Sequence, residues 1–247
     1  MILRFVGNAG GRYELIYNDG VNTATGGFRI CGTYNIHVDP GPNVLCQMQK
    51  YGWKIRNTDI VITSHYHIDH VNDVNLFAEA RKGITLICPL SMLDYKNTPI
   101  TEYHRKRINI VIGKVNETWK NRGISITFTK TKHTEDGFGF ILNMDDKTIG
   151  YTSDTAYFSE LKEIYKHVDV LIINTMALNH NYKHFLNHNY KHLNVYEGGE
   201  IGKGIKKVIF YHISKHIIKN WKSISEKLKN KYNVEPILAM PGLELKI

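Results

Sequence analysis

The stretch Ser64-His65-Tyr66-His67-Ile68-Asp69-His70 holds three histidines and an aspartate in seven residues. It follows the apolar run Ile60–Thr63, which is typical of a buried strand. Open α/β folds bind their ligands beyond the carboxyl ends of such strands. His65 and His67, two residues apart in an extended segment, point the same way and can share one ion. Asp69 and His70 follow in the turn and can face a second ion, so the stretch predicts a metal site.

A lone histidine is usually a core or surface residue rather than a ligand. Here four possible ligands occur within six residues of a chain that has 13 histidines in all, and this density favours the metal site. Imidazole and carboxylate ligands suit zinc, manganese or iron.

Short apolar or alternating segments predict strands throughout the chain, and longer segments with helical spacing lie between them. The predicted strands are Met1–Val6, Tyr13–Tyr17, Phe28–Cys31, Tyr34–Val38, Ile60–Thr63, Ile84–Cys88, Ile108–Ile112, Ile124–Lys132, Gly139–Leu142, Thr148–Tyr151, Val170–Asn174 and Lys207–Tyr211. The predicted helices are Val44–Tyr51, Asn72–Lys82, Tyr157–His167, Val195–Lys203 and Ile217–Tyr232. This alternation predicts an α/β fold with helices layered on sheets. Because no Pro/Gly/Ser linker divides the chain, residues 1–247 are expected to form one domain.

The bulk composition is that of an ordinary globular protein, with 42% hydrophobic and 22% charged residues. No run reaches the ~18 apolar residues of a membrane span, and the first residues lack the pattern of a signal peptide, so we expect a cytoplasmic protein without a membrane partner. Cys31, Cys46 and Cys88 have no metal-site spacing and are expected to be buried free thiols. The net charge of +9 weakly favours anionic partners.

The pattern His65-x-His67-x-Asp69-His70 resembles the signature of the metallo-β-lactamase-fold hydrolases. Four further segments match motifs of that family in the family's order. They are Asp39-Pro-Gly41, His133 before Gly137-Phe-Gly-Phe140, Asp154 within Gly150-Tyr-Thr-Ser-Asp-Thr155, and His212 after Val208-Ile-Phe-Tyr211. The resemblance covers nearly the whole chain and implies a four-layer αβ/βα sandwich.

The resemblance also implies a ligand set for two divalent ions, with zinc the first expectation and manganese or iron the alternatives. His65, His67 and His133 would hold one ion, Asp69, His70 and His212 the other, and Asp154 would bridge the pair. Two ions at such a spacing lower the pKa of a shared water toward ~7, and the resulting hydroxide attacks the substrate. Asp69 is therefore a candidate catalytic residue as well as a ligand.

Within the family, Asp154 differs from the cysteine of many β-lactamases, and His67 differs from the glutamate of the di-iron oxygen-reducing enzymes. The closer resemblance is to the phosphodiesterase branch, which contains the tRNA 3′-end endonucleases and the cyclic ribose-phosphate phosphodiesterases. His192-Leu-Asn194 resembles a motif of that branch whose histidine protonates the leaving oxygen or stabilises charge on the phosphoryl group. The segment 187–192 repeats 179–184, so His188 is a second candidate and His184 a third, and a solvated loop histidine is the competing interpretation.

Only 20 residues separate His133 from Asp154, too few for the substrate-gripping arm of the tRNA enzymes. We therefore expect a small or cyclic anionic phosphodiester as substrate, and a nucleic acid is less favoured. A carbon-centred hydrolase of lactones or thioesters, an RNA-processing nuclease and a catalytically idle binding module are the alternatives. Many relatives dimerise, so a homodimer is a further expectation.

Thr25-Gly-Gly-Phe-Arg29 resembles a segment of small archaeal members of the family. Arg29 could pair with a phosphate there. The favoured interpretation is instead a tight hairpin with Arg29 on the surface.

Overall fold

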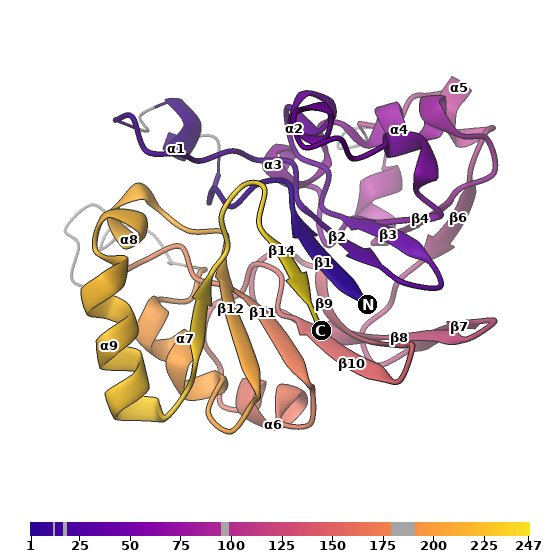
Figure 1. Cartoon of the computed structure of the whole chain (residues 1–247). Coiled ribbons are helices and arrows are strands. Elements are labelled where there is room, and N and C mark those ends of the chain that lie inside the picture. The colour runs from indigo at the N-terminus through magenta and orange to yellow at the C-terminus, as the bar shows by residue number, and fades with distance from the viewer. Residues whose placement is uncertain (12, 17–18, 95–98, 179–190) are drawn as a thin grey trace.

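Two seven-stranded sheets form the centre of the computed structural model, which describes residues 1–11, 13–16, 19–94, 99–178 and 191–247 (Figure 1). The first sheet has the order β14 (Glu244–Lys246), β1 (Ile2–Phe5), β2 (Phe28–Cys31), β3 (Asn35–Val38), β4 (Ile60–Ile62), β5 (Thr85–Cys88) and β6 (Asn109–Ile112). The second has the order β13 (Pro236–Leu238), β12 (Lys207–Tyr211), β11 (Val170–Asn174), β10 (Lys147–Tyr151), β9 (Phe138–Met144), β8 (Ile124–Lys130) and β7 (Thr118–Asn121).

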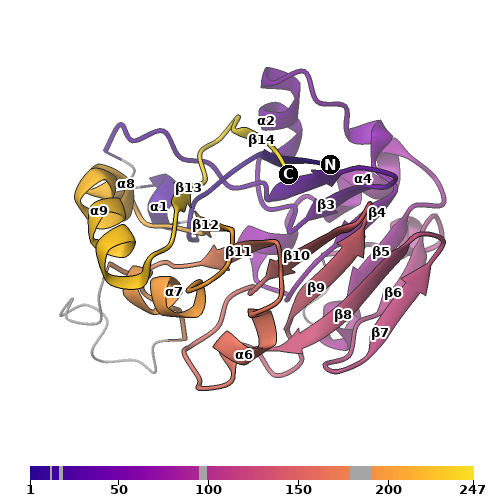
Figure 2. The ribbon, with the colours of Figure 1, turned by 60° about the horizontal axis from the view of Figure 1, so that its bottom comes forward.

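Helices cover the outer face of each sheet (Figures 1 and 2). The first sheet carries α2 (Val44–Lys50), α3 (Ile68–Val71), α4 (Val74–Ala80) and α5 (Glu102–Arg105). The second carries α6 (Leu161–Tyr165), α7 (Val195–Ile201), α8 (Lys215–Lys219) and α9 (Trp221–Tyr232). The short helix α1 (Tyr13–Ile16) follows β1, and the two ends of the chain lie side by side because β1 pairs with β14.

Strands β4 and β12 are apolar on both faces because each face packs into a core. On β4, Ile60 and Ile62 enter the core between the sheets, while Val61 enters the core beneath α2 and α4. On β12, Ile209 faces the other sheet, while Val208 and Phe210 face the helices. Continuous apolar runs are expected of strands buried on both sides. The predicted four-layer αβ/βα sandwich is therefore confirmed.

Parallel pairing gathers the ends of several strands at one edge. Strands β3, β4, β5 and β6 run parallel, and so do β10, β11, β12 and β13. Strand β8 shares the direction of β10 because both pair antiparallel with β9. The carboxyl ends of β4, β8, β10 and β12 carry the predicted ligands, so the topology brings those residues to a common rim.

Two of the predicted elements differ in type or in number, while others, such as the predicted helix Tyr157–His167, which is Leu161–Tyr165, differ only in their bounds. The predicted strand Tyr13–Tyr17 is wrong, because 13–16 forms α1 and residue 17 lies outside the described residues. The Glu14 carboxylate there accepts a hydrogen bond of 2.7 Å from the backbone N–H of Lys215, at the start of α8. The predicted helix Ile217–Tyr232 is two helices, α8 and α9, separated at Asn220, whose ψ of 10° departs from helical geometry.

Arg29 is neither on the surface nor at the rim. It is 2% exposed on β2, and its guanidinium donates a hydrogen bond of 2.8 Å to the Thr58 hydroxyl beside Met48 of α2. The favoured expectation of a surface residue is wrong, because this face of β2 is covered. The expectation of three buried thiols is also wrong, since Cys88 is buried, Cys31 half-buried and Cys46 exposed. In the described part of the chain, no helix is long and apolar enough to cross a membrane.

Candidate metal centre

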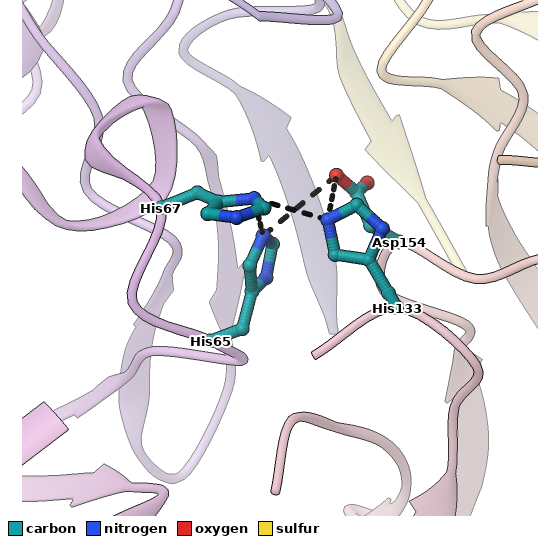
Figure 3. A group of neighbouring side chains, drawn as sticks. All are labelled: His65, His67, His133 and Asp154. Atoms are coloured by element: carbon teal, nitrogen blue, oxygen red, sulfur yellow. Dashed lines mark hydrogen bonds and ion pairs between the residues drawn. The ribbon is translucent and has the colours of Figure 1, made fainter. Parts of the chain in front are cut away.

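The seven predicted ligands converge at the rim formed by the strand ends. His65, His67, His133 and Asp154 form one group (Figure 3), and Asp69, His70 and His212 form another. Within each group the ligand atoms lie within 4.8 Å of one another. The segment after β4 supplies four of the seven residues, and the loops after β8, β10 and β12 supply one each.

The first group directs three ring nitrogens at a common point. His67 Nδ1 lies 3.0 Å from His65 Nε2 and 3.0 Å from His133 Nε2. Asp154 Oδ2 completes the group, 3.8 Å from His65 Nε2 and 3.6 Å from His133 Nε2. Figure 3 shows the three rings and the carboxylate pointing toward one another.

Hydrogen bonds behind the rings fix which nitrogen faces inward. His133 Nδ1 donates to the backbone carbonyl of Lys191 at 3.0 Å, which leaves Nε2 with a lone pair. His65 Nδ1 lies 3.1 Å from the Ser64 hydroxyl, whose own hydrogen goes to Asp39. Ser64 must therefore accept from His65, and His65 Nε2 is also unprotonated. Outer partners of this kind orient metal-ligating histidines.

The pKa values of these histidines agree with that assignment. Burial lowers the pKa of His65 well below its ordinary value, and the nearby His70 lowers it further. Burial also lowers the pKa values of His67 and His133. Neutral imidazoles that aim lone pairs at one point repel each other unless a cation lies between them. The donor set therefore fits a divalent metal ion.

The second group has the opposite electrostatic character. Asp69 Oδ2 lies 3.3 Å from both His70 Nε2 and His212 Nε2. Burial alone would lower the pKa of His70, but Asp69, Asp154 and Asp39 raise it well above its ordinary value. Burial likewise opposes ionisation of Asp69, yet His70 and His212 hold the pKa of that carboxyl well below its usual range. Without a metal, protonated His70 supplies the positive charge that these carboxylates require.

Asp154 touches both groups. Its Oδ2 lies 3.4 Å from His70 Nε2, and its Oδ1 lies 3.4 Å from His212 Nδ1. Burial would raise the pKa of this carboxyl, but His212, His70 and His192 hold it well below its usual range. An ionised, fully buried carboxylate between two clusters of ligands has the position required of a residue shared by two ions.

The sequence placed Asp39 in a matching turn and did not single out Asn174, and it predicted for neither residue a role in holding the ligands. Asp39 accepts hydrogen bonds from His70 Nδ1 at 2.9 Å and from the Tyr151 hydroxyl at 2.6 Å. Asn174 Nδ2 donates to Asp154 Oδ1 at 2.8 Å, which turns Oδ2 toward the ligands. Asp39 and Asn174 are polar residues at the ends of apolar strands. This pattern is visible in the sequence and could have marked both as residues at the rim.

The backbone turns sharply where three strands end at the rim. Asp39, Ser153 and His212 have φ values of 51°, 55° and 52°, in the left-handed region that residues other than glycine seldom adopt. They follow β3, β10 and β12. Gly41 packs closely against the backbone of Asp69, so that a Cβ added at Gly41 would collide with the carbonyl oxygen of Asp69. Strained backbone of this kind often marks a functional site.

Residues 34–213 match the model of the beta-lactamase superfamily domain. The chain belongs to this superfamily. An uncharacterised protein of Methanocaldococcus jannaschii is 32% identical over 183 residues, which span 69% of this chain and 67% of that protein. The UPF0173 metal-dependent hydrolase YtkL of Bacillus subtilis is 30% identical over 124 residues, 47% of this chain and 54% of YtkL.

Solved structures resemble this chain over almost its whole length, among them a protein described as having the metallo-β-lactamase fold. YhfI from Bacillus subtilis covers 99% of this chain and 98% of its own, with a TM-score of 0.79 and 21% identity. The short form of human tRNase Z covers 100% and 99%, with a TM-score of 0.72 and 13% identity. A diphosphatase of the PhnP family covers 100% and 97%, with a TM-score of 0.72 and 14% identity. At these identities the likeness shows the fold, which is the one predicted.

His192 lies beside the candidate metal centre. Its Nδ1 is 3.6 Å from Asp154 Oδ2, and its ring stacks on that of His212 with centroids 5.7 Å apart. Its side chain is 19% exposed, against 7% for His133 and 4% for His212, so it can meet a molecule from solvent. The alternative candidates His184 and His188 lie outside the described residues.

We expect the metal-free protein to lose thermal stability in mild acid. Burial lowers the pKa values of a set of histidines, whereas the unfolded chain regains values near 6.5. These are His37, His65, His67, His133 and His192. The unfolded state then binds more protons, so the free energy of unfolding falls as pH drops through about 6.5. His70 opposes this, because its raised pKa stabilises the fold below 6.5 and that contribution is lost as pH rises through the folded value.

The five histidines with lowered pKa values destabilise the fold in acid by more than His70, with its raised pKa, stabilises it. Between pH 7.5 and 5.5 the Tm of the metal-free protein should fall by roughly 5–10 °C. Differential scanning calorimetry after chelator treatment measures this change in Tm. His104→Gln, at a histidine remote from the centre, should leave the trend unchanged. A Tm that stays constant or rises toward pH 5.5 would contradict the expectation.

Proposed function

We propose that this protein is a metal-dependent hydrolase of phosphodiesters, acting on a small or cyclic substrate with two divalent ions. The relatives support metal-dependent hydrolysis, since YtkL is named a metal-dependent hydrolase. One observation carries the choice of a phosphodiester as substrate: the partly exposed ring of His192 lies against the carboxylate that both ligand groups share. A phosphodiester bound there would meet a proton donor and a dense set of ligands together.

Each residue has a distinct task in the proposed reaction. His65, His67 and His133 would hold one ion, and Asp69, His70 and His212 the second. Asp154 would keep the two at a fixed separation. Bound divalent ions supply Lewis acidity to phosphoryl oxygens and lower the pKa of nearby water.

His192 would transfer a proton to the departing oxygen, since an alkoxide is a poor leaving group unless it is protonated. Burial lowers the pKa of His192 to about 4, so the ring is neutral at pH 7 without substrate. The negative charge of a phosphodiester placed against the ring raises that pKa, and the general-acid role requires this effect to outweigh the opposing charge of the two ions. The same position would let the ring stabilise charge on the phosphoryl group.

The test is hydrolysis of bis(p-nitrophenyl) phosphate by protein stripped of metal and reloaded separately with Zn²⁺ and Mn²⁺. We expect stripping to remove activity and at least one of the ions to restore it. The number of bound ions should be measured on the same samples by mass spectrometry.

Two outcomes are informative in different ways. Two bound ions with no cleavage of any phosphodiester would leave the metal centre standing and overturn the proposed substrate class. Lactones and thioesters would then be the next substrates. Activity that survives complete metal removal would overturn the proposal as a whole.

A further inference from the structure

Two surface hollows join end to end beside the metal centre. The near hollow, about 640 Å³, is lined by His133 itself together with Tyr66, Lys132, Glu135 and Lys191. The far hollow, about 880 Å³, shares Tyr66 and Glu135 with the near one. The Tyr66 ring packs edge-on against the ring of His67, with centroids 5.3 Å apart. A groove therefore runs from the metal ligands past Tyr66 and away from them.

The near hollow is positively charged. Lys191 Nζ donates a hydrogen bond of 3.0 Å to the carbonyl oxygen of His133, which fixes an ammonium at the edge of the centre. Lys132 also lines this hollow, and its ammonium lies 5.3 Å above the ring of Phe158, just outside the lining. Lys191 and Lys132 outnumber the one carboxylate of the lining, Glu135, and this balance of charge suits a substrate's anionic group.

The far hollow has a different lining. Its walls carry the apolar side chains Leu90, Leu93, Ile112 and Val115. Its charged side chains are three carboxylates and one lysine, namely Asp94, Glu135, Asp136 and Lys114. Lys114 is partly neutralised by Glu117 at 4.0 Å. This hollow favours an uncharged group and repels a further phosphate.

Hydrogen bonds hold the wall of the far hollow in place. Asp136 accepts hydrogen bonds from the backbone N–H of Ser91 at 2.7 Å and from its hydroxyl at 2.5 Å. These bonds tie the short 3₁₀ helix Leu90–Leu93 to the loop that carries His133. The wall of the hollow and a metal ligand are thereby held in one rigid unit. Its volume lies within the range of small-molecule sites.

We propose that the groove selects phosphodiesters in which one arm is a nucleoside. The phosphate lies at the metal centre with any second phosphate against Lys132 and Lys191. The base packs on Tyr66 and the apolar walls, and a hydroxyl of the sugar donates to Glu135. The negative far hollow excludes a continuing polynucleotide. This inference rests on the proposed phosphodiesterase function and names its substrate class.

The test compares two esters with the same leaving group, thymidine 5′-(p-nitrophenyl phosphate) and methyl p-nitrophenyl phosphate, on metal-reloaded protein. We expect kcat/KM to be at least about tenfold higher for the thymidine ester. Leu90→Asp adds a charge at a side chain that is already 63% exposed. It should lower the ratio of the two kcat/KM values about fivefold, through KM of the thymidine ester. Tyr103→Asp, at a 57% exposed residue outside both hollows, should leave the ratio unchanged.

A ratio near one, or a ratio that Leu90→Asp does not alter, overturns the nucleoside arm while cleavage itself upholds the phosphodiesterase. If neither ester is cleaved, the proposed function fails. Titration calorimetry then tests separately whether the groove binds a nucleoside. Thymidine 5′-monophosphate should bind the metal-loaded protein at least about tenfold more tightly than methyl phosphate, and Leu90→Asp should remove the difference. Equal affinities would overturn the inference by that route.

Discussion

Asp154→Ala is expected to lower metal-restored phosphodiester cleavage by about 10³-fold or more, because the carboxylate is in contact with both ligand groups. Its removal leaves the imidazoles around it without the shared negative charge that balances two cations. The metal content should fall with the activity, since neither group keeps its full set of ligands. Initial rates and bound metal, measured on the same preparation, test both expectations.

Two further variants separate chemistry from folding. Asp154→Asn keeps the shape of the side chain and loses only the charge, so it should be almost as inactive. Asp169→Ala removes a carboxylate whose partner is the exposed Lys206, and it should keep both activity and metal. Full activity in Asp154→Ala, in a protein that still requires metal, would show that this carboxylate is not the shared ligand.

His192→Ala is expected to lower cleavage of an alkyl phosphodiester by about 10²–10⁴-fold. The loss should be much smaller for a p-nitrophenyl ester, because p-nitrophenolate departs without needing a proton. Metal content should stay the same if the ring acts on the substrate. The comparison of leaving groups is thus a direct readout of proton donation.

The ring of His192 could instead serve as a ligand, since a ring nitrogen of His192, a carboxylate oxygen of Asp154 and a ring nitrogen of His212 form a group of suitable spacing. In that case His192→Ala would lose metal and would affect both esters equally. His104→Ala, at a histidine bonded to Glu79 on another surface, is the matched control and should change neither rate. Equal losses for the two esters at unchanged metal content would sink the general-acid role.

The sequence predicted the strands inside each sheet better than most of the strands at the sheet edges. Val170–Asn174 and Lys207–Tyr211 are confirmed to the residue, because both faces of these strands are buried and their apolar runs are unbroken. The edge strands β7, β13 and β14 were not predicted. They are short and partly exposed, so the apolar pattern that marks a strand is weak there.

The candidate ligands could be found from sequence because four of them occur in one motif and the others each follow an apolar strand. Their supporting residues could not be assigned in the same way. Nothing local in the sequence shows that Asp39 lies beside His70, 31 positions further along the chain. Arg29 illustrates the opposite error, since its charge suggested exposure while the fold buries it beneath α2. Such contacts depend on how distant strands pair.

The distribution of the ligands along the chain has a consequence for biosynthesis. His70 and its partner His212 are 142 residues apart, and the motif around His70 leaves the ribosome well before the strand that carries His212 has been made. At translation rates of ~5–20 residues per second, that delay is on the order of ten seconds. During that delay the nascent chain presents a histidine-rich segment that still lacks His133, Asp154 and His212. If the seven residues hold metal as proposed, tight binding would have to await docking of the second sheet, near the end of folding.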